Sequence, residues 1–150
     1  MDELVSDLET ESVVDLLAGM EGLDTLSRSD IQHHIIPLIH ISRFNPGQRI
    51  IGIRTLNHAM YILYRGRMRV EVSFGGSKKN IYLEPGAIFG EMAVVKPQRP
   101  TRANVYADDY STLLSIDIES FQSVMRQNVS IIRAFAILIG KRVVRLTTQN

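Results

Sequence analysis

The chain has 150 residues, a length that suits one domain with a sizeable core. Hydrophobic residues make up 45% and charged residues 22%, and the net charge of +1 gives no overall attraction to nucleic acid or to an anionic membrane. Cysteine is absent, which excludes disulfides, thiolate metal sites and a cysteine nucleophile. The acidic start of the chain lacks the features of a signal peptide, and no apolar run is long enough to span a bilayer. We therefore expect a soluble, cytoplasmic protein.

Residues 1–40 are expected to form helices. The first is predicted over residues 12–20, where apolar side chains recur at helical spacing, Ser12 with Asp15 resembles a capping box, and Gly22 ends the helix. The second begins at Ser27, a favourable N-cap, and Pro37 is expected to bend or shorten it. Disorder is expected only at the two ends of the chain.

Residues 41–118 have the pattern of a β-domain, with short runs rich in Val, Ile and Tyr. The run 60–64 predicts a strand buried on both faces, and residues 67–72 alternate as in a half-exposed strand. Gly66 between them predicts a tight turn, so these two strands are expected to form a hairpin. Several short strands at this spacing favour a barrel or jelly roll. The other turn signals are Asn45-Pro46-Gly47, Gly75-Gly76-Ser77 and Glu84-Pro85-Gly86.

Helical spacing returns after Ser120, and predicts a short helix around residues 121–125 and a longer amphipathic helix over 129–146. The apolar stripe of the longer helix can pack on the barrel, and its length also favours a homodimer. The single domain of residues 1–150 is thus divided into N-terminal helices over 1–40, a β-roll over 41–118 and C-terminal helices over 119–150. The stripe consists of Ile132, Phe135, Ile139, Val143 and Leu146.

The segment 85–95 carries the predicted binding chemistry. A strand ends in glycines there and a short apolar turn follows, an arrangement that exposes successive backbone N–H groups at a helix start. Such groups attract anions because they are unpaired and the helix dipole is positive at this end. Gly90 allows a ligand to approach the backbone closely. Glu91 would repel a phosphate, but its carboxylate can accept a hydrogen bond from a hydroxyl such as that of a ribose.

The run Phe89-Gly90-Glu91-Met92-Ala93-Val94-Val95 resembles the phosphate-binding cassette of the cyclic nucleotide-binding domain family. That family includes the catabolite activator protein, the regulatory subunit of protein kinase A and gated channels. The resemblance covers nearly the whole chain, through residues 22–27, 44–47 and 61–72. It implies a mostly β fold with flanking helices: an eight-stranded β-roll, or jelly-roll barrel, with N-terminal helices and two C-terminal helices.

The resemblance also implies roles for single residues. Glu91 would bind the ribose 2′-hydroxyl, and Gly90 with the backbone N–H groups of Met92 and Ala93 would face the cyclic phosphate. The ligand-binding residues expected on this basis are Phe89, Gly90, Glu91, Met92, Ala93, Thr101, Arg102 and Ala103.

One position departs from the family pattern. The family's phosphate arginine opens the next strand, four residues before an inward valine that aligns with Val105, and this chain has Thr101 there. Arg102 takes over the role if a bulge after Pro100 turns it inward. Otherwise Thr101 and the backbone hold the phosphate, and losing a charge-assisted contact of roughly 1.5–3 kcal/mol weakens binding about ten- to a hundredfold. Arg99 is expected to be solvated.

The first functional hypothesis is a non-catalytic sensor that binds a cyclic nucleotide, cAMP in preference to cGMP. The C-terminal helices close over the base and an unknown effector protein reads the shift in population. No catalytic residue, cofactor or metal is expected, because no nucleophile has an oriented base and the β-region has no His-x-His. DNA binding is not expected either, because the chain stops at Asn150, before the place where the family's transcription factors carry a helix-turn-helix.

The alternative is a degenerate barrel that has lost tight nucleotide binding and serves as a protein–protein interaction or dimerisation module. The pair Thr101-Arg102 discriminates between the two hypotheses. A third possibility, a cupin-type enzyme, is disfavoured by the missing metal ligands.

Overall fold

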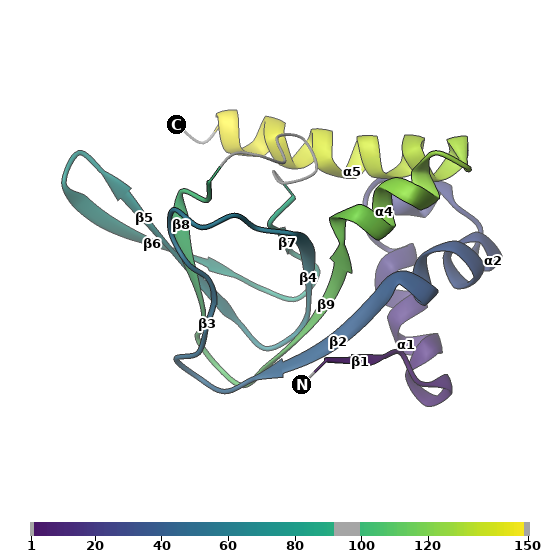
Figure 1. Ribbon diagram of the computed structural model, residues 1–150, viewed down its shortest axis with the longest axis horizontal. Coiled ribbons are helices and arrows are strands. Elements are labelled where there is room, and N and C mark those ends of the chain that lie inside the picture. The colour runs from purple at the N-terminus through teal and green to yellow at the C-terminus, as the bar shows by residue number, and fades with distance from the viewer. Residues whose placement is uncertain (1, 92–99, 149–150) are drawn as a thin grey trace. The chain divides into compact units, whose positions relative to one another are not determined.

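The computed structural model describes residues 2–91 and 100–148. The chain divides into two compact units (Figure 1). One comprises Met1–Leu4 and His40–Ile118, and the other comprises Val5–Ile39 and Glu119–Asn150.

The first unit consists of two β-sheets (Figure 1). The five-stranded sheet has the order β1-β2-β9-β4-β7 and the four-stranded sheet the order β3-β8-β5-β6. The eight strands β2 to β9 form the roll, so the predicted fold class is confirmed. The strands are β1 (Asp2–Leu4), β2 (Ile39–Phe44), β3 (Arg49–Ile51), β4 (Ala59–Arg65), β5 (Met68–Phe74), β6 (Ser77–Leu83), β7 (Ile88–Phe89), β8 (Ala103–Ala107) and β9 (Ser111–Asp117).

The prediction that β4 and β5 form a hairpin at Gly66 is wrong. β4 pairs with β7 and β9, whereas β5 pairs with β6 and β8, so the chain crosses from one sheet to the other at Gly66. The φ of Gly66 is 97°, and a Cβ at this residue would clash with Ser111 and the backbone of Tyr110. The hairpin lies instead between β5 and β6, where Gly75 and Gly76 both have positive φ, as a two-residue type I′ turn requires.

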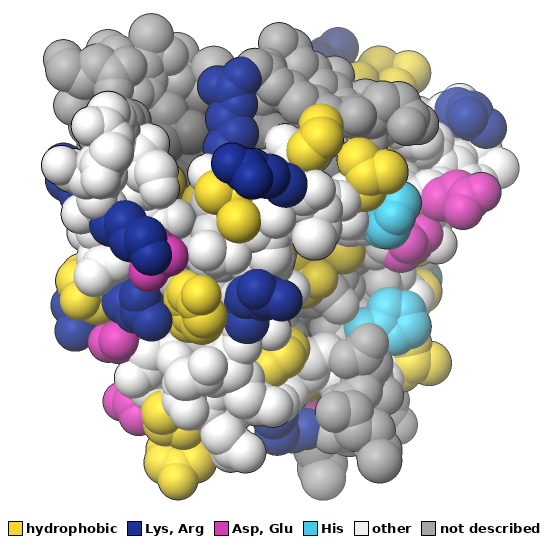
Figure 2. All heavy atoms as spheres, turned by 60° about the vertical axis from the view of Figure 1, so that its left-hand side comes forward, with side chains coloured by type: hydrophobic (Ala, Val, Ile, Leu, Met, Phe, Trp, Pro, Cys, Tyr) yellow, Lys and Arg dark blue, Asp and Glu magenta, His cyan; other side chains and the backbone are white. Residues whose placement is uncertain are grey.

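Both sheets contribute to the core of the roll. Met68 of β5 is fully buried and pairs with Leu83 of β6 and Ala107 of β8. Since side chains alternate along a strand, the even-numbered residues of β5 face inward and the odd-numbered residues face outward. On the outer face the guanidinium groups of Arg67 and Arg69 stack on tyrosine rings, at 4.2 and 4.5 Å. Figure 2 turns the left-hand side of Figure 1 forward, where basic side chains are interspersed with acidic and hydrophobic ones.

The first helix of the second unit, α1 (Asp7–Ala18), begins five residues before the predicted start. Its N-cap is therefore Ser6 rather than Ser12, and Gly19, not Gly22, follows its last turn. The predicted N-cap of the second helix is confirmed, because Ser27 Oγ accepts a hydrogen bond from the backbone N–H of Asp30 at 3.0 Å. That helix runs through α2 (Arg28–Asp30), a π-helical turn η2 (Ile31–Ile35) and a 3₁₀ turn η3 (Ile36–Leu38) that contains Pro37.

The two predicted C-terminal helices are present as α4 (Ile118–Met125) and α5 (Val129–Thr148). They join through Phe121 and Phe135, which are both buried and meet edge to face at 4.5 Å. Of the predicted apolar stripe, Phe135 and Ile139 are buried, whereas Ile132 is 42% exposed and the buried face is completed by Ile131, Ala134 and Leu138. The side chains of Val143 and Leu146 lie outside the described part. In the described part of the chain, no helix has both the length and the apolar character needed to cross a membrane.

Candidate functional site

The turn after β7 places two predicted site residues. Phe89 pairs with Tyr61 of β4, and their rings stack with centroids 5.0 Å apart. Gly90 follows with φ 77°, and a Cβ there would lie 2.7 Å from Asn57 Nδ2 and 2.8 Å from the carbonyl oxygen of Ala59. Both the backbone angle and the close neighbours therefore require glycine.

Glu91 directly follows this fixed glycine and is only 3% exposed. Because a buried carboxylate is costly unless it is hydrogen-bonded or paired, glutamate is rarely placed inside a fold without a use for its oxygens. Glu91 lies just after the end of β7, beside this glycine, and its part in ligand binding stays a prediction. Met92, Ala93 and Arg99 lie outside the described residues.

Thr101 is held by the loop before β4. Its hydroxyl donates a hydrogen bond to the carbonyl oxygen of Gly52 at 2.5 Å and accepts one from the backbone N–H of Thr55 at 3.2 Å. The backbones also pair: Thr101 N–H donates to Thr55 O and Arg54 N–H donates to Thr101 O, both at 2.8 Å. The hydroxyl of Thr101 is thus engaged in anchoring the loop.

Arg102 is exposed and makes no hydrogen bond or ion pair with the rest of the described chain. From Ala103 to Ala107 strand β8 keeps an unbroken register with β5, and Val105 points into the core. Alternation therefore puts Ala103 on the inner face, whereas Arg102 lies in a bend just before β8, outside the paired residues. The irregularity in this part of the sheet lies in β3, between Arg49 and Ile51. The phosphate-binding role of Arg102 stays a prediction.

The loop 52–57 joins the two halves of the predicted site, a feature that the sequence reasoning missed. Thr55 bonds to Thr101, as described above, and Asn57 Nδ2 donates to the carbonyl oxygens of Ala59, at 2.6 Å, and Gly90, at 3.2 Å. Gly90 and Thr101 are therefore positioned by one short loop. The only sequence signal for this arrangement is the polar pair Asn57-His58 directly before a buried strand, which by itself indicates no function.

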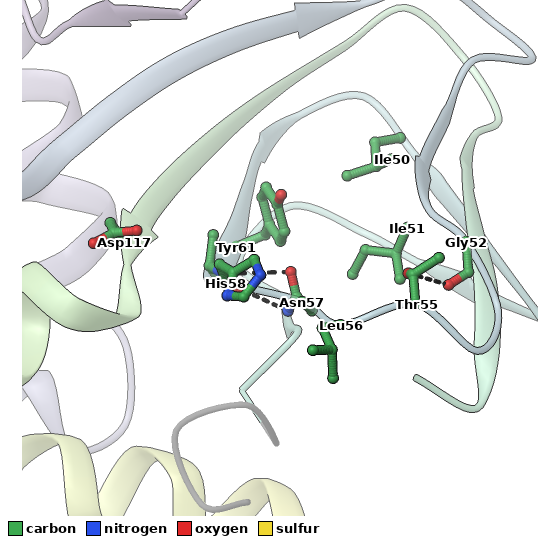
Figure 3. A pocket seen from close by; sticks show the side chains of 10 residues that line it. Ile50, Ile51, Gly52, Thr55, Leu56, Asn57, His58, Tyr61 and Asp117 are labelled. Carbon is green, nitrogen blue, oxygen red and sulfur yellow. Dashed lines mark hydrogen bonds between the residues drawn. The ribbon is translucent and has the colours of Figure 1, made fainter. Parts of the chain in front are cut away.

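A pocket of about 300 Å³ opens beside this loop (Figure 3). A volume of this order is at the lower end of the range for small-molecule sites. Its lining combines an aromatic ring and apolar side chains with hydrogen-bonding groups, a mixture suited to a flat ligand with polar substituents. The lining residues are Ile50, Ile51, Gly52, Thr55, Leu56, Asn57, His58, Ala59, Tyr61 and Asp117. Among the described residues, no cluster of His and carboxylate side chains could hold a metal ion.

Comparisons with known proteins agree with this architecture. Residues 41–128 match the cyclic nucleotide-binding domain family. The chain therefore belongs to the cyclic nucleotide-binding domain family.

Individual relatives extend the comparison. The chain is 31% identical over 107 residues to the potassium/sodium hyperpolarization-activated cyclic nucleotide-gated channel 2 of Mus musculus, a match that spans 71% of this chain and 12% of the channel. The fold is similar to a cyclic nucleotide-binding domain from Methylobacillus flagellatus KT, with a TM-score of 0.86 at 10% identity over 99% of this chain and 84% of that one. It is also similar to the regulatory domain of Toxoplasma gondii PKA crystallised with cAMP, with a TM-score of 0.70 at 18% identity over 79% of this chain and 45% of that one.

Proposed function

We propose that this domain is a non-catalytic sensor that binds a cyclic nucleotide, with cAMP preferred over cGMP. The observation that carries the proposal is the buried carboxylate of Glu91, fixed at the end of β7 by a glycine that no other residue can replace without strain. A carboxylate accepts hydrogen bonds only, so it suits the hydroxyl of a sugar and disfavours a direct phosphate contact. The preference for cAMP is supported by the fold similarity to the Toxoplasma gondii domain, whose structure contains cAMP.

Binding would divide the ribose and the phosphate of the ligand between two parts of the site. Glu91 accepts the ribose 2′-hydroxyl, while the backbone N–H groups expected at Met92 and Ala93 face the cyclic phosphate. The C-terminal helices α4 and α5 then respond to occupancy, because a ligand that binds one arrangement of the helices more tightly shifts the population toward it. An effector protein, or a second copy of the chain, reads that shift. No step of this mechanism requires a catalytic group.

A second candidate function is supported by a specific observation. The hydroxyl of Thr101 is engaged by the loop 52–57, and Arg102 is exposed in a bend before β8. A domain that lacks a cation for the phosphate would bind nucleotides weakly and act as an interaction or dimerisation module. The two candidates differ in affinity, so a direct binding measurement separates them.

Calorimetric titration of cAMP and cGMP into the wild-type chain and the variant Glu91→Ala provides that measurement. Since a hydrogen bond to a charged group contributes roughly 1.5–3 kcal/mol, Glu91→Ala is expected to weaken cAMP binding about ten- to a hundredfold. The matched control is Glu84→Ala, which removes a glutamate whose side chain is 67% exposed and pairs with Arg67 at 3.1 Å, and which should leave affinity unchanged.

Each result has a clear reading. Absence of heat with either nucleotide at millimolar concentration in the wild type would overturn the sensor proposal in favour of the interaction module. Equal affinity of the wild type and a correctly folded Glu91→Ala variant would remove the role assigned to Glu91 alone.

A further inference from the structure

The inner face of the four-stranded sheet becomes more exposed toward the β5–β6 turn. Its innermost row is Met68, paired with Leu83 and Ala107, and all three are buried. In the next row Val70 pairs with Ile81 and Val105, and Ile81 is already 39% exposed. This face therefore continues as an apolar surface beyond the core.

The third row of this face contains a cation. Val72 pairs with Lys79 on one side and with Ala103 on the other. Because alternate residues of a strand face the same side, Lys79 shares the inner face with Ile81 and Leu83. Lys79 is exposed, and it makes no ion pair or hydrogen bond within the described residues.

The neighbouring lysine behaves differently. Lys78 faces outward, and its ammonium lies 3.7 Å from the carboxylate of Glu71. A lysine on an outer sheet face with an acidic partner needs no further explanation. Lys79 lies on the apolar inner face instead, and its position there does need an explanation.

The row of Lys79 ends at Ala103, the start of β8, close to the position where the family pattern has an arginine and this chain has Thr101. Two strand spacings separate Lys79 from Ala103, which is about 10 Å. Ala103 directly follows Thr101, whose hydroxyl is engaged by Gly52, and Arg102, which is exposed in a bend before β8. A ligand lying on Val72 would therefore have Lys79 on one side and the start of β8 on the other. The flexible four-carbon stem of lysine allows its charge to follow a ligand placed there.

We propose that Lys79 supplies the cation for the phosphate of the bound nucleotide, in place of an arginine at the start of β8. This inference rests on the proposed function, because it requires that the domain bind a cyclic nucleotide. The competing explanation is that β6, an edge strand of its sheet, carries an inward lysine to prevent pairing with other chains. The two explanations predict different binding properties.

The test is calorimetric titration of cAMP into the wild type, Lys79→Met, Lys79→Arg and the matched control Lys78→Met. At a salt concentration of about 0.05 M, Lys79→Met is expected to bind about tenfold more weakly, while the other two variants stay within about twofold of the wild type. The difference between the wild type and Lys79→Met should shrink at about 0.5 M salt, because the charge is exposed and therefore screened.

Wild-type affinity in Lys79→Met would overturn the inference, leave the sensor proposal intact and identify Lys79 as an edge-protecting residue. An equal loss in Lys78→Met, or a loss that does not respond to salt, would also overturn it, since neither reflects a specific ionic contact. Absence of binding by the wild type would remove the sensor proposal and this inference together.

Discussion

Gly90 occupies a left-handed backbone conformation, with a φ of 77°, and its α-carbon is enclosed by Asn57 and Ala59. Gly86 has a similar φ of 94°, but a Cβ added to it would have no neighbouring atom within 4 Å. Replacement by alanine costs about 1–2 kcal/mol at either position because of the backbone angle. Only Gly90→Ala adds steric overlap, so we expect it to lower the free energy of unfolding by about 1–3 kcal/mol more than Gly86→Ala.

Urea unfolding of the two variants measures this difference. Equal losses would show that the contacts of Asn57 and Ala59 do not constrain position 90. Because Glu91 is positioned by this glycine, Gly90→Ala should also weaken cAMP binding, whereas Gly86→Ala should not.

The sequence was sufficient to predict that residues 89–91 form a turn at the end of a strand, because glycine, its neighbours and the turn signal are local. It was not sufficient to predict the hydrogen bonds of Thr101 with Gly52 and Thr55, or that of Asn57 with Gly90. These contacts join residues that are 33 to 49 positions apart. Which residues meet across such distances depends on strand pairing, which a single sequence does not specify.

At the scale of elements, Gly22 lies directly against the backbone of α5 in the helical unit. It precedes the short turn η1 (Leu23–Thr25), has a φ of 100°, and a Cβ there would lie 2.6 Å from Ala134 O and 2.7 Å from Leu138 N of α5. Both neighbours are backbone atoms and cannot rotate away. We expect Gly22→Ala to destabilise the protein by about 1–2 kcal/mol for the backbone angle and about 1–3 kcal/mol for the overlap.

Gly19→Ala is the control for this prediction. The backbone of Gly19 is in the right-handed helical conformation, with φ −87°, and a Cβ added there would have its nearest neighbour 3.6 Å away. Alanine there should be neutral or stabilise the protein by up to about 1 kcal/mol, because it restricts the unfolded chain. Thermal unfolding compares the melting temperatures of Gly22→Ala and Gly19→Ala. Similar values would contradict the close packing of η1 on α5.

The elements themselves were largely predictable, but their partners were not. A continuous apolar run revealed β4 and polar–apolar alternation revealed β5. Neither pattern carries information on which strands pair, so the crossing at Gly66 was mistaken for a hairpin. The same limit explains β1, which pairs with β2 although disorder was expected at the start of the chain. Along α5 Phe135 and Ile139 are buried as expected, but Ile132 was chosen in place of Ile131, because the two are equally apolar and only packing distinguishes them.

At the scale of the whole molecule, the proposal divides the work between the two units. The first unit contains the described residues among those predicted to bind the ligand, and the helical unit contains most of α4 and all of α5, which are proposed to respond. The match to the channel covers 12% of that relative, so the process that such a sensor controls depends on its partner, and the ligand site is the part that this chain can test alone.

Titration of cAMP into isotope-labelled protein, followed by the backbone amide signals in NMR spectra, tests the central claim most directly. The account predicts that the signals of Gly90, Glu91 and Thr101 shift progressively and saturate together, with smaller shifts in the loop 52–57. Unchanged signals at millimolar cAMP, or saturating shifts confined to residues remote from the turn after β7, would contradict it.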